Sequence, residues 1–137
     1  MNPDVRFTDR ELDVMGALWE LNSGTVAEVR EHLAADLAYT SVLKVLQILE
    51  EKGHVRHENE GQAYRYFSTV RREEAGRSAL RRVVDGIFQG SAELTLAHLV
   101  QTRPIPKREL REMMQILKEL EAEDTSLDER ADEEDEP

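Results

Sequence analysis

Two hydroxyl residues and one lysine near position 40 have side chains suited to reading a polar partner. Thr40 and Ser41 are adjacent, and Lys44 follows Thr40 by four residues. Short hydroxyl groups and a single ammonium can donate hydrogen bonds to base edges and phosphates in the major groove of DNA. In the alternative interpretation, Thr40 caps a helix and Lys44 is a hydrated surface charge. These three residues by themselves leave both interpretations open.

An amphipathic helix over residues 39–52 must position these side chains. The segment contains no Gly or Pro, and Gly53 follows it where a left-handed cap is expected. On a helical wheel one side is apolar, with Val42, Val45, Leu46 and Leu49. The opposite side is polar, with Thr40, Lys44, Gln47 and Glu51. The pattern therefore predicts one face for a core and one face that is presented to a partner.

Capping boxes that begin at Thr8 and Thr25 predict two earlier helices, over residues 8–21 and 25–35. After Gly53 the apolar periodicity changes to two, and segments 54–58 and 63–68 predict a β-hairpin. Three helices followed by a hairpin are the arrangement of a winged helix-turn-helix domain. In that arrangement the third helix enters the major groove and the hairpin lies along the DNA backbone.

Helical spacing returns after the hairpin, over residues 71–88, 91–102 and 107–122. We therefore expect a mostly α fold, in which a winged helix-turn-helix domain precedes a three-helix dimerisation region. The predicted domains are a DNA-binding domain over 5–70, a helical dimerisation domain over 71–122 and a disordered acidic tail over 123–137.

Three basic residues around the hairpin are candidates for contact with DNA phosphates: Lys52, Arg56 and Arg65. Isolated surface arginines and lysines are usually only hydrated, so this second interpretation stays open for each of them.

The net charge of −11 comes from 18 basic and 29 acidic residues, and it is unevenly distributed. Residues 1–70 carry −5, residues 71–120 carry +3, and residues 121–137 carry −9. An acidic run cannot bury enough apolar area to offset its ordering entropy, so we expect disorder from about residue 123. Without that tail, the acidic balance is no longer a strong argument against nucleic-acid binding.

Several chemistries are excluded or disfavoured by residue type. The chain has no cysteine, which excludes disulfides and thiolate metal sites. Its four histidines, His32, His54, His57 and His98, lack the spacing of a metal site, and we expect no cofactor. No Gly-rich phosphate loop or pairing of a nucleophile with a base indicates an enzyme. No apolar run is long enough to cross a membrane and no signal peptide is evident, so we expect a cytoplasmic protein.

The helices after the hairpin carry more apolar residues than three short helices can bury against one another. An intertwined homodimer would cover them, whereas a monomeric helical cap on the winged domain is the alternative. The residues predicted at the dimer interface are Leu80, Val83, Val84, Ile87, Phe88, Leu96, Leu99, Val100, Leu110, Met113, Met114 and Leu117.

Four segments together resemble the penicillinase-repressor (BlaI/MecI/CopY) family of winged-helix regulators. They are residues 8–15 with Leu18 and Trp19, residues 38–42, residues 46–53, and residues 64–66; the resemblance extends over roughly residues 5–120. It implies a bacterial repressor that binds a palindromic DNA operator as a homodimer. It also implies that Thr40, Ser41 and Lys44 meet the bases, with Tyr39 at the entry of the reading helix.

The chain departs from the family pattern at two places. Several members are cut by a membrane sensor protease in the fifth helix, commonly at an Asn-Phe bond, and the equivalent pair here is His98-Leu99. The sequence therefore leaves two alternatives for release of the repressor from DNA. One is cleavage by a sensor protease as a partner, and the other is a different signal. Copper-responsive members carry a cysteine cluster, which this chain lacks.

Two functions remain to be distinguished. The first is a dimeric, sequence-specific transcriptional repressor. The second is a protein-interaction adaptor that keeps the winged fold without binding DNA, an alternative prompted by the −5 charge of residues 1–70.

Overall fold

The structure is a computed structural model that describes residues 5–134, with side chains described through residue 125. It divides into two compact units on either side of the Gly90–Ser91 bond. The predicted domain boundary after residue 70 lies inside the first unit. Residues 1–4, where a signal peptide was sought, and residues 135–137 of the predicted acidic tail lie outside the described residues.

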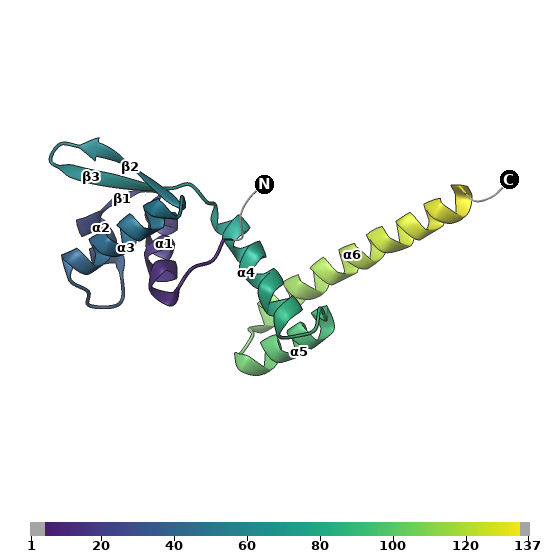
Figure 1. Cartoon of the computed structure of the whole chain (residues 1–137). Helices are drawn as coiled ribbons and strands as arrows, with labels where there is room; N and C mark the ends of the chain where they lie inside the picture. Colours follow the sequence, from purple (N-terminus) through teal and green to yellow (C-terminus); the bar gives the residue numbers. More distant parts are fainter. Residues whose placement is uncertain (1–4, 135–137) are drawn as a thin grey trace. The chain divides into compact units, whose positions relative to one another are not determined.

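The first unit contains a winged helix followed by one further helix (Figure 1). Its elements are α1 (Asp9–Leu21), β1 (Gly24–Thr25), α2 (Val26–His32), α3 (Tyr39–Glu51), β2 (Val55–Glu60), β3 (Ala63–Ser68) and α4 (Arg72–Gly86). The strands form an antiparallel sheet in the order β1-β3-β2. The predicted order of three helices and a hairpin is thereby confirmed, whereas the two-residue strand β1 was not predicted.

Both predicted capping residues begin a helix. Thr8 Oγ1 accepts from the Glu11 N–H at 3.2 Å, while Glu11 Oε1 accepts from the Thr8 N–H at 3.0 Å. Thr25 Oγ1 accepts from the Glu28 N–H at 3.2 Å. These bonds satisfy N–H groups that have no partner within the helix, which is why α1 and α2 begin where they do.

The second helix ends earlier than expected. Helix α2 stops at His32, and Leu33 leaves it in an extended conformation, so the prediction of a helix to about residue 35 is wrong at its end. Arg30 Nε donates to the carbonyl of Leu37 at 2.7 Å and holds the segment that leads into α3.

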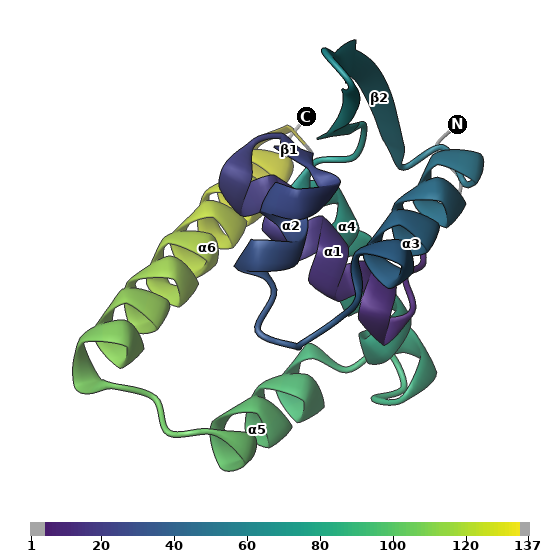
Figure 2. The same cartoon turned by 90° about the vertical axis from the view of Figure 1, so that its left-hand side faces the viewer.

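The core of the first unit lies between α1, α2, α3 and the sheet, as Figure 2 shows for the three helices. Its fully buried side chains are Val14, Met15, Leu18, Val29, Val42, Leu46 and Leu49, with Tyr66 from β3 almost fully buried. Gly53 and Gly61 adopt positive φ angles of 83° and 64°, which end α3 and close the hairpin turn. The hairpin register runs from Val55 opposite Ser68 to Glu60 opposite Ala63.

The second unit contains α5 (Ala92–Thr102) and α6 (Lys107–Glu134). Helix α6 continues beyond Ala122, whereas the sequence suggests that the helix ends there and that a disordered tail begins at residue 123. Residues 107–134 contain neither Gly nor Pro, and contacts one turn apart, such as Arg108 with Glu112 at 3.4 Å, support the helix. Charge content by itself therefore gave the wrong helix end. Among residues 5–134, no helix has the length and apolar composition that a membrane crossing requires.

Candidate nucleic-acid interface

The outer face of α3 brings together the polar residues that the sequence singled out. Thr40, Ser41 and Lys44 are exposed, whereas Val42 and Leu46 on the other side of the helix are fully buried. The residue that precedes the first helical turn is Ala38, which offers no side-chain cap. Thr40 therefore lies within the helix and does not cap it, and its side chain is exposed to a partner.

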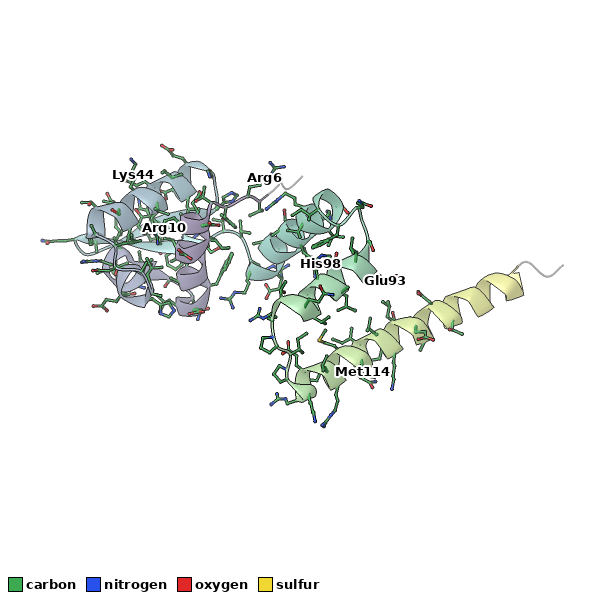
Figure 3. All side chains as sticks on the ribbon, turned by 90° about the horizontal axis from the view of Figure 1, so that it is seen from below. Arg6, Arg10, Lys44, Glu93, His98 and Met114 are labelled. Atoms are coloured by element: carbon green, nitrogen blue, oxygen red, sulfur yellow. The ribbon has the colours of Figure 1, made fainter. Side chains whose placement is uncertain are left out.

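Lys44 supplies the positive charge of this face. Figure 3 shows it projecting outward from α3, and within the described part of the chain it forms no ion pair. Tyr39, at the first helical position, is 46% exposed. The N-terminal turn of a helix carries a partial positive charge, which adds to the attraction of Lys44 for a phosphate. Shape and charge thus suit insertion of this end of α3 into a groove of DNA.

Lys52 lies at the other end of α3 and is already paired. Its Nζ lies 2.9 Å from Oε1 and 2.8 Å from Oε2 of Glu11, whose side chain is only 5% exposed. Burial would raise the pKa of Glu11, but the hydrogen bonds from Lys52 and Thr8 hold this pKa below its ordinary value. Lys52 lies about 18 Å along the helix axis from Thr40, so the structure does not bring it to the end of α3 that carries Thr40, Ser41 and Lys44.

Arg65 on β3 forms ion pairs with two carboxylates. Its guanidinium donates to Glu28 on α2 at 2.9 and 3.2 Å, and to Glu60 on β2 at 3.0 and 3.1 Å. It also donates to Ser23 Oγ at 3.2 Å. These hydrogen bonds raise the pKa of Arg65 and lower that of Glu28. These ion pairs join the hairpin to α2, and a phosphate would have to compete with two carboxylates for this guanidinium.

Arg56 on β2 is also paired, but it is more accessible. It donates to Glu58 at 2.7 Å, and its guanidinium carbon lies 4.3 Å above the Phe67 ring. Both members of the Arg56–Glu58 pair are more than half exposed, so this pair contributes little to stability and can open easily.

One link between α3 and the hairpin was not predicted from the sequence. His57 Nδ1 lies 2.6 and 2.8 Å from the carboxylate oxygens of Glu50, and its ring lies 4.4 Å from the ring of Tyr64. His57 and Glu50 lie seven residues apart across a turn. Only the position of the hairpin against α3 brings them together, and the periodic patterns of the two segments do not show which of their residues will meet.

The residues predicted at the dimer interface are largely uncovered. Leu80, Val83 and Ile87 on α4 are 58%, 39% and 69% exposed, whereas Val84 and Phe88 are half-buried. Within the second unit Met113 is half-buried, and the remaining members are 37–55% exposed: Leu96, Leu99, Val100, Leu110, Met114 and Leu117. Met114 is labelled on α6 in Figure 3. No side chain among residues 91–125 is buried, so α5 and α6 have no closed core of their own.

The pair aligned with the family's cleavage position lies inside a helix. His98 and Leu99 both belong to α5, and His98 Nδ1 donates to the carbonyl of Leu94 at 3.0 Å. A protease would have to unfold this part of α5 locally before it could bind the bond in an extended form.

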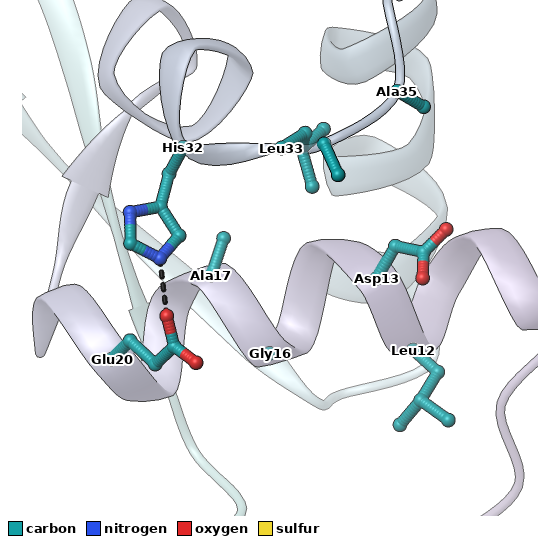
Figure 4. A pocket seen from close by; sticks show the side chains of 9 residues that line it. Leu12, Asp13, Gly16, Ala17, Glu20, His32, Leu33 and Ala35 are labelled. Atoms are coloured by element: carbon teal, nitrogen blue, oxygen red, sulfur yellow. Dashed lines mark hydrogen bonds and ion pairs between the residues drawn. The ribbon is translucent and has the colours of Figure 1, made fainter.

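A hollow of about 380 Å³ lies between α1 and the end of α2 (Figure 4). Glu20 and His32 are hydrogen-bonded at one end of it, and Asp13 lines the other end. Across the described residues, no group of three or more potential ligands is placed to hold a metal ion.

Comparisons with known proteins match this chain to a family of repressors and to a transcriptional regulator. The family model described as penicillinase repressor matches residues 7–119. Transcriptional regulator BlaI from Mycobacterium tuberculosis, in strains CDC 1551 and H37Rv, is 37% identical over 103 residues, which are 70% of this chain and 72% of the relative.

Solved structures also match. A mutant of MarR from E. coli, complexed with operator DNA, has a TM-score of 0.50 at 14% identity and covers 83% of this chain and 75% of its own. At that identity the likeness concerns the fold alone. The solution structure of the DNA-binding domain of the repressor BlaI has a TM-score of 0.47 at 25% identity, over 54% of this chain and 93% of that domain.

Proposed function

The chain belongs to the penicillinase repressor family, and from that premise we propose that it binds a palindromic operator as a homodimer, with the outer face of α3 reading the bases. The family and the BlaI relatives make it a DNA-binding transcriptional repressor. Membership also rules out the adaptor alternative and agrees with the expectation that the chain is not an enzyme.

The exposed side chains of Thr40, Ser41 and Lys44 carry the proposal for base reading. They lie on one face and within one and a half turns of the N-terminal end of α3, opposite a fully buried apolar face. A helix held in this way can enter the major groove without disturbing the core. We propose that the two hydroxyl groups and the ammonium contact base edges and adjacent phosphates, with Tyr39 at the groove entrance.

The basic residues around the hairpin take different roles in this proposal. Arg56 can exchange Glu58 for a phosphate, because both members of that pair are exposed. Arg65 can bind a phosphate only if it breaks its ion pairs with Glu28 and Glu60. For Lys52 we propose a structural role in place of the expected phosphate contact, because its ammonium neutralises the buried Glu11.

Dimerisation is proposed from the exposed apolar faces after the hairpin. A second copy of the chain would cover the leucines, valines and methionines of α4, α5 and α6, none of which is fully buried within one protomer among the side chains described through residue 125. Two linked winged units also gain affinity and selectivity, because the second half-site is bound in an intramolecular step.

Two further points belong to the proposal. A repressor has to reach chromosomal DNA, so we place the chain in the cytoplasm. A sensor protease that cut near His98 and Leu99 would separate α6 from the winged unit and would abolish the proposed dimer, although another releasing signal would serve equally well.

Selection of bound DNA fragments from the host genome tests this proposal. A dimeric repressor should enrich promoter fragments that contain inverted half-sites, and its affinity for them should fall steeply as salt rises. Enrichment of fragments without inverted symmetry, or retention of no DNA at low salt, would contradict it.

A further inference from the structure

A small set of hydrogen bonds fixes the middle of α4 to the start of the chain. Arg82 Nη1 donates to the main-chain carbonyl of Val5 at 2.9 Å and to Ser78 Oγ at 3.0 Å. Ser78 Oγ lies 3.4 Å from the same carbonyl. Ser78 and Arg82 are four residues apart, so they lie on the same side of the helix. We call these three residues the α4 latch.

The segment that the latch holds is itself fixed to the winged unit. Val5 is only 8% exposed. The Phe7 ring packs edge-on against the rings of Trp19 and His54, with centroid distances of 6.2 and 5.1 Å. Thr8 then begins α1 as its cap. The carbonyl of Val5 is therefore a well-placed anchor, and Arg82 connects α4 to the core through it.

A second attachment holds the beginning of α4. Trp19 Nε1 donates at 2.8 Å to the carbonyl of Val70, which lies two residues before the helix begins. Arg72, the first helical residue, lies with its guanidinium carbon 5.7 Å from the Trp19 ring centroid, and Ala75 is buried. Arg72 and Arg82 are about 15 Å apart along the axis. Two attachments at that separation fix the direction of the α4 axis as well as the position of its first turn.

The latch and the proposed dimer interface occupy opposite sides of α4. At about 100° per residue, Ala75, Ser78 and Arg82 lie within 60° of one another. Leu80, Val83 and Ile87 point to the other side and are exposed. One side of α4 thus holds the winged unit, while the other side is the one proposed to meet the partner copy.

We propose that Arg82 is a positioning residue that sets the half-site spacing which the repressor accepts. By holding Val5, it fixes the direction of α4 relative to α3, and so it fixes the position of each reading helix relative to the exposed side of α4 that is proposed to meet the partner copy. Operator half-sites must face the same side of the duplex, and one extra base pair rotates the second half-site by about 34°. This inference rests on the dimeric operator binding proposed above.

The test is selection on random duplex DNA with the full-length chain, for the wild type and for Arg82→Ala. Arg81→Ala is the matched control. Arg81 is adjacent to Arg82 and exposed, and its replacement by Ala removes the same charge. Arg82→Lys, which keeps a donor and the charge, serves as the partial rescue. For each protein the selected half-site sequence and the distribution of spacings between inverted half-sites are read separately. Light scattering confirms that each variant has the same mass as the wild type.

We expect the wild type and Arg81→Ala to select one dominant spacing, with at least roughly tenfold weaker binding when one base pair is inserted. Arg82→Ala should select the same half-site but several spacings, and the penalty for the inserted base pair should fall below about threefold. Arg82→Lys should be intermediate. A single unchanged spacing for Arg82→Ala, a changed half-site, or a wild type without a preferred spacing would overturn the inference. Selection without paired half-sites would instead overturn the dimeric operator binding itself.

Discussion

The ammonium of Lys52 lies 2.8 and 2.9 Å from the two carboxylate oxygens of Glu11 and so ties the end of α3 to the first turn of α1. Glu11 is also the residue that closes the capping box with Thr8. One carboxylate therefore both closes the capping box of α1 and holds α3 against it. Lys52, which the sequence predicts as a phosphate contact, is paired with Glu11 in the structure, and its contact with DNA stays a prediction.

Replacement of Lys52 by Met should destabilise the chain by about 1–2 kcal/mol, because it leaves the buried Glu11 carboxylate without its cation. The effect is smaller than for a fully buried pair, since the Lys52 side chain is 41% exposed and partly screened by solvent. Urea unfolding measures this change in the free energy of unfolding. Lys44→Met is the matched control and should change stability by no more than about 0.5 kcal/mol. Equal effects of the two variants would contradict the structural role of Lys52.

Stability should also fall as the pH drops below neutrality, in part because of His54. Burial, followed by the charge of Lys52, lowers the pKa of His54 below its ordinary value of 6.5. The unfolded chain then binds a proton at a higher pH than the folded chain does. Stability is therefore fully present above about pH 6.5 and is lost as the pH falls toward the lowered pKa. Urea unfolding between pH 7.5 and 5 should give a shallower decrease for His54→Gln than for the wild type. Parallel curves would show that His54 does not contribute.

Charge placed in the proposed dimer interface should produce monomers. Ile87 is 69% exposed on α4, and Ile87→Asp would bury a carboxylate if a second copy covers this side. Light scattering should report half the mass of the wild type, and affinity for a single half-site should stay unchanged. Leu12→Asp on α1, which is 49% exposed outside the proposed interface, should leave the mass unaltered. A dimer that persists with Ile87→Asp would place the interface elsewhere.

The acidic C-terminal segment should reduce non-specific DNA binding. Residues 123–137 carry a net charge of −8, and we expect this charge to compete with DNA phosphates for the basic side chains of the protein. A chain that ends at Ala122 should bind random duplex DNA roughly three- to tenfold more tightly at low salt, with a smaller change for operator DNA that also has base contacts. Fluorescence anisotropy measures both affinities, and equal binding of random DNA by the two chains would reject this role.

Local signals in the sequence were sufficient for most of the fold. The capping residues Thr8 and Thr25 predicted the starts of two helices, and Gly53 and Gly61 marked the end of α3 and the hairpin turn. The wheel of residues 39–52 separated the buried Val42 from the exposed Lys44. Each of these features depends on residues within a few positions of one another, which is the range over which sequence patterns report structure.

Features that depend on distant residues were not predictable in this way. The partners of Lys52 and Arg65 include Glu11 and Glu28, which lie 41 and 37 residues earlier in the chain. An alternating strand pattern identifies an exposed arginine, but it cannot show that a carboxylate from another element will meet it. The strand β1 has only two residues and is too short for any periodicity. It forms only because β3 lies beside it.

The base-reading role of α3 is tested most directly by the affinity of the double variant Ser41→Ala with Lys44→Ala for operator DNA selected by the wild type. These side chains are exposed, so the variant should keep the stability and mass of the wild type. We expect fluorescence anisotropy to show affinity reduced by about 10- to 100-fold or more, because contacts to bases and phosphates are lost from both half-sites. Arg10→Ala, which removes one exposed positive charge from α1, should change affinity by less than about threefold. Unchanged operator affinity of the double variant would contradict the assignment of α3 as the reading helix.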